Sequence, residues 1–134
     1  MPETRTRGDA DTVTKISGRS VGDTVARLTD LVTAKGMRLF AVIDQAAEAR
    51  KVGLQLRDTT MVIFGSPVAG TPVMVAAPLA ALDLPLKVLV WADGQQTKVS
   101  YDAPAAIAGR RGLSPELAAN LAGINALTDA LVTP

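Results

Sequence analysis

The chain has 134 residues, of which 48% are hydrophobic and 20% are charged, so it is long and apolar enough to form one folded domain. It contains no cysteine and no histidine, which excludes disulfides, thiolate nucleophiles, imidazole metal ligands and Ser-His dyads. The formal net charge is +1, which gives no large electric field to attract nucleic acid or an anionic membrane, and neither partner is expected.

The first part of the chain predicts a tail, a strand and a helix. Residues 1–11 carry charges of both signs and no apolar run, and we interpret them as a disordered tail before a single domain, 12–134. Residues 12–17 alternate in polarity and predict a short strand, although the pattern leaves open which side chains face inward. Ser20 is typical of a helix N-cap, and apolar residues at steps of three and four predict a helix that ends near Lys35.

The middle of the chain predicts two strands joined by a short helix. Residues 37–43 are strand-like, and Asp44 can cap a helix over 45–52. Residues 59–64 form a continuous β-branched and aromatic run, which favours a strand buried on both faces. We therefore expect that strand in the middle of the sheet.

A helical region with several prolines follows. Ser66 and Thr71 each precede a proline, which is the residue order of a helix cap followed by the first helical position. A helix is predicted between 71 and 82, in two pieces divided at Pro78, because proline lacks a backbone donor and clashes with the preceding turn.

The C-terminal part predicts a hairpin and one long helix. Residues 86–92 and 97–101 flank Asp93-Gly94, which tolerates the positive φ values of a tight turn between antiparallel strands. Ser114 and the apolar spacing after it predict one amphipathic helix that reaches residue 131. The order β-α-β-α-β-α-β-β-α predicts an α/β fold of the α+β type: a two-layer sandwich with a mixed sheet of about five strands and helices on one face.

Three stretches of the chain resemble the family called domain of unknown function 302. They are RLFAVIDQAAEARKVGLQL at 38–56, VIFGSPVAGTPVM at 62–74, and the segment from LDLPLKVLVWAD to KVSY at 82–101. The resemblance covers about 13–112, and the combination of FG-x-P, GTP-x-M and LDLPL-x-x-LV is more specific than any one piece.

The resemblance implies a compact α/β fold and a tendency to form homodimers, without an agreed activity. Histidine is usual in this family where the chain has Gln45, and frequent at the position of Arg111, so imidazole-dependent chemistry of relatives is in doubt here. The apolar composition also favours a homodimer, through an edge of the sheet or the helix over 117–131.

A ligand could bind where polar groups lie at the ends of the predicted elements. We expect a groove where the start of the helix at residue 45, the loop 65–71 and Tyr101 approach one another. In it, Gln45 and Tyr101 would form hydrogen bonds, backbone N–H groups at the loop would meet an anionic or carbonyl group, and Arg111 would add charge. The candidate residues are Gln45, Ser66, Thr71, Tyr101 and Arg111. Arg111 could instead simply be solvated in the turn before the last helix.

Two functions are compatible with the sequence. The first is an uncharacterised, cytoplasmic, homodimeric domain without catalytic activity, which either binds a small molecule, such as an anionic one, or has a structural role. The second is an enzyme of low activity on a small anionic metabolite, with Lys51 or Tyr101 as acid or base and loop N–H groups as an anion hole. No catalytic dyad supports the second function, and neither a metal nor a cofactor is expected.

Overall fold

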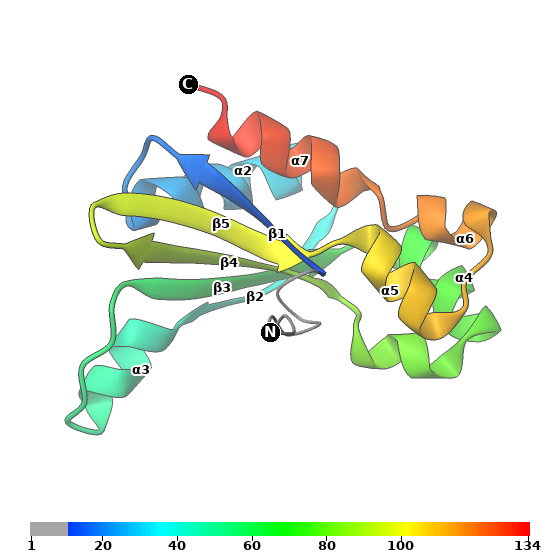
Figure 1. The fold of residues 1–134 in the computed structure, drawn as a ribbon, viewed down its shortest axis with the longest axis horizontal. Coiled ribbons are helices and arrows are strands. Elements are labelled where there is room, and N and C mark those ends of the chain that lie inside the picture. Colours follow the sequence, from blue (N-terminus) through cyan, green and yellow to red (C-terminus); the bar gives the residue numbers. More distant parts are fainter. Residues whose placement is uncertain (1–10) are drawn as a thin grey trace, which may run out of the picture.

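A computed structural model describes residues 11–134, which form a sheet with helices on one face and at both ends (Figure 1). The sheet has five strands in the order β1-β5-β4-β3-β2, and every neighbouring pair is antiparallel. The strands are β1 (Thr12–Ser17), β2 (Arg38–Asp44), β3 (Thr59–Gly65), β4 (Leu86–Asp93) and β5 (Gln96–Asp102). The α+β sandwich expected from the sequence is confirmed, but the sheet is wholly antiparallel rather than mixed.

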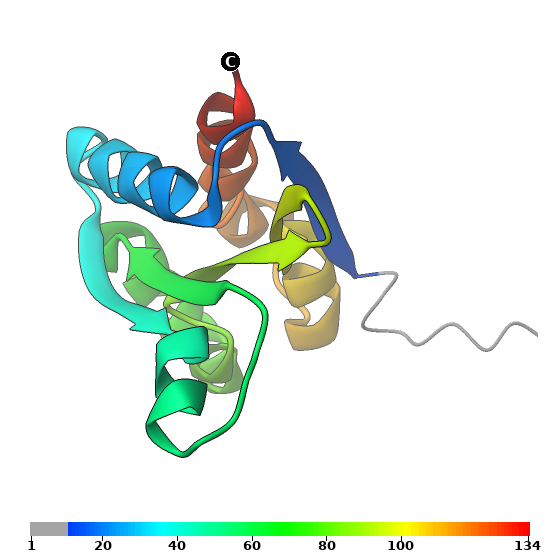
Figure 2. The same ribbon diagram turned by 90° about the vertical axis from the view of Figure 1, so that its left-hand side faces the viewer.

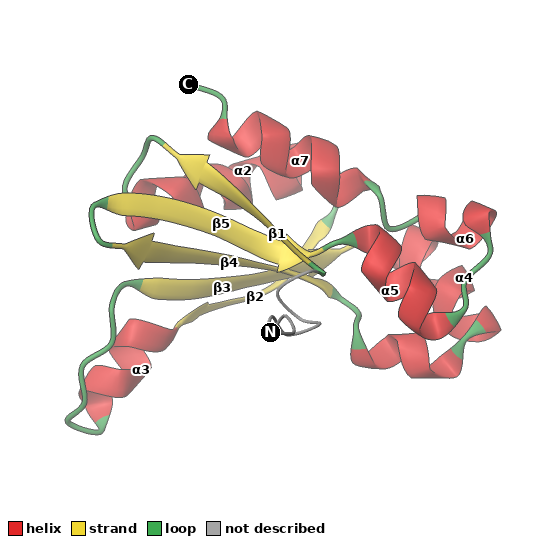
Figure 3. Cartoon of the chain, viewed as in Figure 1, coloured by secondary structure: helices red, strands yellow, loops and turns green. Residues whose placement is uncertain are grey.

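Two helices cover one face of the sheet, and the others lie at its ends. Helices α2 (Val21–Ala34) and α7 (Gly123–Val132) lie side by side over that face (Figure 2). Helix α3 (Gln45–Lys51) projects from one end of the sheet. A group of short helices gathers at the opposite end (Figure 3): α4 (Pro67–Ala76), the 3-10 helix η1 (Pro78–Leu82), α5 (Pro104–Arg111) and α6 (Pro115–Ala119).

The helices differ from the prediction in three ways. Helix α4 begins directly after Ser66 rather than at 71, although the division before Pro78 is where the sequence placed it. Helix α5 was not predicted. The single long helix expected at the C-terminus is two helices, α6 and α7, which are separated by a turn at 120–122.

The main core lies between the sheet and helices α2 and α7. Buried side chains of both helices, such as Leu28 and Leu127, pack against Val62 and Phe64 of β3 and Val90 of β4. Strand β3 has neighbours on both sides but buries only one face, because Val62 and Phe64 alternate with half-buried residues. The prediction of a central strand buried on both faces is therefore wrong; β4 is the central strand.

Strand β1 directs a lysine toward α7. Lys15 Nζ donates hydrogen bonds to Thr128 Oγ1 at 2.6 Å and to the Asn125 carbonyl oxygen at 3.1 Å, and it lies 2.8 Å from an Asp129 carboxylate oxygen. Partial burial would lower the pKa of Lys15, but hydrogen bonds with Asp129 and Tyr101 raise it, and the net effect is a raised pKa. Lys15 is therefore charged, and its contacts link β1 to α7.

The segment from α4 through η1 exposes many apolar side chains. Residues 66–82 include no charged side chain. A small second core holds this segment through Val73 and Ala80, which contact Ile107 and Leu121. Its outer side leaves large apolar side chains in solvent: Val68, Val75, Leu79 and Leu82. Among the described residues, no helix combines the length and the apolar character needed to cross a bilayer.

The predicted tail and domain boundary fall mostly outside the described residues, which begin at 11. Residue 11 itself is joined to the sheet, because the Asp11 carbonyl oxygen accepts a hydrogen bond of 2.8 Å from the Ala103 backbone N–H. This residue is therefore not part of a disordered tail, and the boundary at 12 stays a prediction.

Candidate functional site

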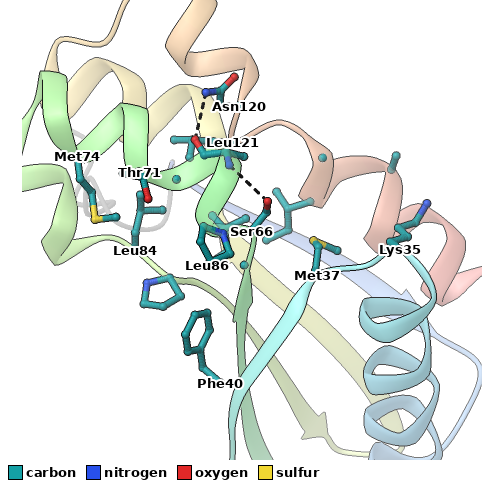
Figure 4. A pocket seen from close by; sticks show the side chains of 18 residues that line it. Lys35, Met37, Phe40, Ser66, Thr71, Met74, Leu84, Leu86, Asn120 and Leu121 are labelled. Atoms are coloured by element: carbon teal, nitrogen blue, oxygen red, sulfur yellow. Dashed lines mark hydrogen bonds between the residues drawn. The ribbon is translucent and has the colours of Figure 1, made fainter.

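A pocket of about 440 Å³ opens at the end of the sheet where β2 begins and β3 ends (Figure 4). One wall comes from Met37 and Phe40, at the start of β2. The other walls come from the turn between β3 and α4, from residues 84–86 before and at the start of β4, and from residues 120–126 around the start of α7. The pocket thus lies where four parts of the chain, distant in sequence, meet.

Local structure explains how these walls form. The register shift between Leu39 and Ala41 leaves Phe40 without a partner in β3, and such a bulge can redirect a side chain. Gly65 lies between Pro85 and Phe40: a Cβ atom added to it would be 3.7 Å from Pro85 Cβ and 4.0 Å from Phe40 Cε2, which are ordinary van der Waals distances. Ser66 then caps α4, because its Oγ accepts a hydrogen bond of 3.3 Å from the Ala69 N–H.

The lining of the pocket is mostly apolar, with a few polar groups. Ser66, Thr71 and Asn120 are the uncharged polar side chains, and Asn120 Nδ2 donates a hydrogen bond of 3.1 Å to the Ala69 carbonyl oxygen (Figure 4). Of the described residues that line the pocket, Lys35 is the only charged one. The apolar side chains that form most of the lining are Met37, Phe40, Met74, Leu84, Leu86, Leu121 and Ile124.

Two of the five candidate residues lie together, and Gln45 lies far from them. Ser66 and Thr71 both line the pocket. Gln45 begins α3 directly after Asp44, which pairs with Thr60 at the beginning of β3, whereas the pocket lies beyond Gly65 at its end. Five steps along a strand span roughly 17 Å, so the predicted groove among Gln45, the loop 65–71 and Tyr101 does not form.

Tyr101 is buried in the main core rather than in the pocket. Only 4% of the residue is exposed, and its hydroxyl donates a hydrogen bond of 2.8 Å to Asn125 Oδ1. The Lys15 Nζ lies 5.3 Å from the centre of its ring. Tyr101 therefore connects β5 to α7 and β1, and its hydroxyl does not face the pocket.

The two arginines before the last helices share one carboxylate. Arg111 Nε lies 2.7 Å from Asp83 Oδ2, and Arg110 Nη2 lies 2.9 Å from Asp83 Oδ1. Partial burial would raise the pKa of Asp83, but hydrogen bonds from Arg111 and Arg110 outweigh it and hold this pKa below its usual value. The anion at Arg111 is thus Asp83 of the same chain, which joins η1 to α5.

Lys51, the other residue considered for acid-base chemistry, lies on α3 at the far end of the sheet. Its Nζ lies 2.8 Å from Glu48 Oε2, and this hydrogen bond raises the pKa of Lys51. A lysine that acts as a base near neutral pH needs a lowered pKa, so the observed contact has the opposite effect.

Sequence reasoning missed several residues of the pocket. Lys35 was interpreted only as the end of a helix, and Phe40 only as part of a strand. Nothing in the local sequence of Asn120 indicates its contact with α4, because that contact depends on the turn between α6 and α7. In the part of the chain that the structure describes, no three acidic residues cluster as potential metal ligands.

Comparison with known proteins places the fold in a family. The family described as "Domain of unknown function DUF302" matches residues 13–131. A crystal structure of an uncharacterized conserved protein DUF302 from Bacillus stearothermophilus superposes with a TM-score of 0.77 at 19% identity, covering 91% of this chain and 95% of that one. At this identity the likeness concerns the fold alone.

Curated relatives carry a functional name. The fluoride-specific ion channel FluC 1 of Brucella suis biovar 1 is 36% identical over 113 residues, which cover 82% of this chain and 44% of the relative. FluC 2 of Brucella melitensis biotype 1 is also 36% identical over 113 residues, which cover 82% of this chain and 42% of the relative. The chain thus spans less than half the length of these relatives.

Proposed function

This chain belongs to the DUF302 family, and we propose that it is a ligand-binding domain without catalytic activity, whose site is the pocket lined by Ser66 and Thr71. The observation that carries this proposal is the pocket itself. Its volume of about 440 Å³ lies within the range of small-molecule sites, and such sites combine apolar walls with a few polar groups, as this one does.

The lining favours an organic ligand. The Brucella relatives are named as fluoride-specific ion channels, which raises the question of whether this pocket could hold fluoride. A small anion that leaves water must regain its hydrogen bonds from several donors, whereas most of the lining here is hydrocarbon. A molecule with a substantial apolar part binds more favourably, because it buries apolar surface against the same lining.

The absence of catalysis is proposed from what the titratable candidates already do. Lys51 is paired with Glu48 at the far end of the sheet, and the Tyr101 hydroxyl is bonded to Asn125 in the core. Neither side chain lines the pocket. The cytoplasmic location expected from the sequence stays a prediction, which fractionation of cells that express the protein tests.

A neutral dye tests whether the pocket binds apolar molecules. N-phenylnaphthylamine fluoresces more strongly in apolar surroundings, and we expect saturable binding to the wild-type protein. Thr71→Trp places a large ring in the lining at an exposed position, so it should abolish most of the binding. The matched control is Val75→Trp, on the same helix, at a residue that is 77% exposed and outside the lining.

The outcome separates the pocket from other apolar surfaces. Equal dye binding by the two variants and the wild type would show that the dye binds elsewhere, for example on the outer side of α4 and η1. Circular dichroism of both variants checks that each has folded.

We also propose the homodimer and assign it to the edge of the sheet. The other interface considered from the sequence, the helix over 117–131, is less suited to pairing, because Ile124, Leu127 and Leu131 are at most 2% exposed. Edge strand β2 instead leaves Val42 and Phe40 about half exposed, at 45% and 44%. An edge strand with apolar side chains is suited to pairing with another strand.

A further inference from the structure

We infer that the ligand of this pocket is an amphipathic organic anion, whose charged end lies at Lys35 and whose apolar part lies against Phe40, Leu84 and Met74. This inference rests on the proposed function, because it concerns the chemistry of the molecule that the same pocket binds. It assigns the ligand to one class: a free acid with a single alkyl chain or an aromatic ring.

The charge of the lining is the first observation. Lys35 is the only charged residue among the described residues that line the pocket, and none of these lining residues is a carboxylate that could neutralise it. Lys35 follows the last turn of α2, and its side chain forms no hydrogen bond or ion pair with any residue from 11 to 134. The ammonium group is therefore available to an anion.

A second cation lies beside the same wall. The Arg38 guanidinium lies 5.0 Å from the centre of the Phe40 ring, and Phe40 lines the pocket. Within the described part of the chain, Arg38 has no carboxylate partner, unlike Arg110 and Arg111, which share Asp83. Arg38 does not itself line the pocket, but it adds a positive charge outside the Phe40 wall that no carboxylate among residues 11–134 pairs with.

The arrangement of the lining separates a charged end from an apolar end. In Figure 4, Lys35 and Met74 lie at opposite ends of the row of labelled side chains, with Ser66 and Leu86 between them. A fully apolar ligand would leave Lys35 unused, and a small inorganic anion would leave the apolar walls in water. An amphipathic anion satisfies both ends, because its charge meets the cation and its tail covers the hydrocarbon surface.

Competition against the bound dye tests this inference with ligands that share one tail. Octanoate, octanol and octylamine differ in the charge of their heads at about pH 7. We expect octanoate to displace N-phenylnaphthylamine about tenfold more effectively than octanol, and octylamine to be the weakest. Acetate and inorganic phosphate, which have the charge without the tail, should not displace the dye.

Variants of the charged end identify the source of the preference for octanoate. Lys35→Gln should reduce the advantage of octanoate over octanol about fivefold or more, and Lys35→Glu should favour octylamine. Arg50→Gln is the matched control, because Arg50 is an exposed cation of α3 at the far end of the sheet and should change nothing. All three substitutions replace exposed side chains, so the fold should be retained.

Each outcome supports or overturns the inference. Equal displacement by octanoate and octanol, unaffected by Lys35→Gln while the dye still binds, would overturn the anionic class and leave the proposed function standing. Failure of the dye to bind would overturn both. Displacement of the dye by phosphate but not by octanoate would overturn the inference, because the site would then bind an anion that has no apolar tail. A lipid surface instead of a free acid would be indicated by two results together. Vesicles of phosphatidylglycerol would sediment with the wild type but not with Lys35→Gln, and octanoate would not displace the dye.

Discussion

Asp83 is the side chain on which the packing of the short helices most depends. Its carboxylate has an exposed fraction of only 11%, and it accepts hydrogen bonds from Arg110 and Arg111. Removing this mostly buried charge would leave Arg111 without its carboxylate partner and Arg110 with only the more distant Asp102, at 3.9 Å. Leaving one partner of such a pair unsatisfied costs more free energy than removing both partners. The contact therefore stabilises η1 against α5.

We predict that Asp83→Asn lowers the free energy of unfolding by about 1–3 kcal/mol at neutral pH. The folded pKa of Asp83 lies below its unfolded value, so its contribution is complete above about pH 4 and is lost as the pH falls through the folded pKa. The difference between wild type and variant should therefore shrink in acid. Urea unfolding of both proteins over this pH range measures it.

Asp93→Asn is the control for this prediction. Asp93 is also paired, with Lys98 Nζ at 2.6 Å, but its side chain is 44% exposed. Pairs in water contribute little, so this variant should be much closer to the wild type. A loss for Asp83→Asn that is no larger than that for Asp93→Asn, or that grows in acid, would contradict the role assigned to Asp83.

At the scale of single elements, α4 combines one buried valine with exposed ones. Val73 is fully buried against Ala80, Ile107 and Leu121, whereas Val75 is 77% exposed. Because both residues lie in α4, a change from valine to alanine alters their helix propensity equally. The two positions thus isolate the contribution of packing.

Val73→Ala should lower the free energy of unfolding by about 2 kcal/mol, since two buried methyl groups are lost and a cavity remains. Val75→Ala should change it by less than about 0.5 kcal/mol. Chemical denaturation of the two variants checks the difference. Equal losses of unfolding free energy would contradict this prediction. They would show that the outer side of α4, which is exposed in the described structure, is covered in solution.

Elements were predictable where a cap and an apolar spacing coincide. Ser20 before the stripe of α2 is such a case, and its Oγ accepts the Asp23 N–H at 3.0 Å as expected. Helix α5 was not predicted because its N-cap residue is Ala103, which has no side chain that can accept a capping hydrogen bond. The C-terminal helix was predicted as one long helix because the apolar spacing continues across Gly123, where α7 begins. The low helix propensity of glycine was the signal against a continuous helix.

The candidate site was predictable only in part, because sequence patterns do not say which ends of strands meet. Ser66 and Thr71 were found from a hydroxyl before a proline, and both line the pocket. Gln45 and Tyr101 were joined to them on the assumption of a common groove. Antiparallel pairing of β2 with β3 places Gln45 at the end of the sheet opposite the pocket, and the Tyr101 side chain is buried in the main core.

At the scale of the whole molecule, the two edges of the sheet differ in character. Edge strand β2 exposes Leu39, Phe40, Val42 and Ile43, whereas edge strand β1 has only Ile16 as an exposed large apolar residue. The β2 edge therefore offers more apolar surface, and it is the edge to which the proposed homodimer is assigned.

We predict that light scattering after gel filtration gives a particle of about twice 13.9 kDa for the wild type. Val42→Lys should shift the protein to the monomer, because a charge on an edge strand opposes pairing with a second copy. Ile16→Lys makes the same change on β1 and should leave the dimer intact. A wild-type monomer at micromolar concentration would rule out the proposed assembly.

The proposal that this domain binds an organic anion in the pocket is tested most directly by the amide spectrum of isotope-labelled protein during a titration with octanoate. We predict that the amide chemical shifts change most at five residues that line the pocket and do not change along α3. These residues are Lys35, Gly65, Ala69, Gly70 and Thr71. Changes that are largest in α3 or around Tyr101, or a spectrum that does not change at all, would contradict it.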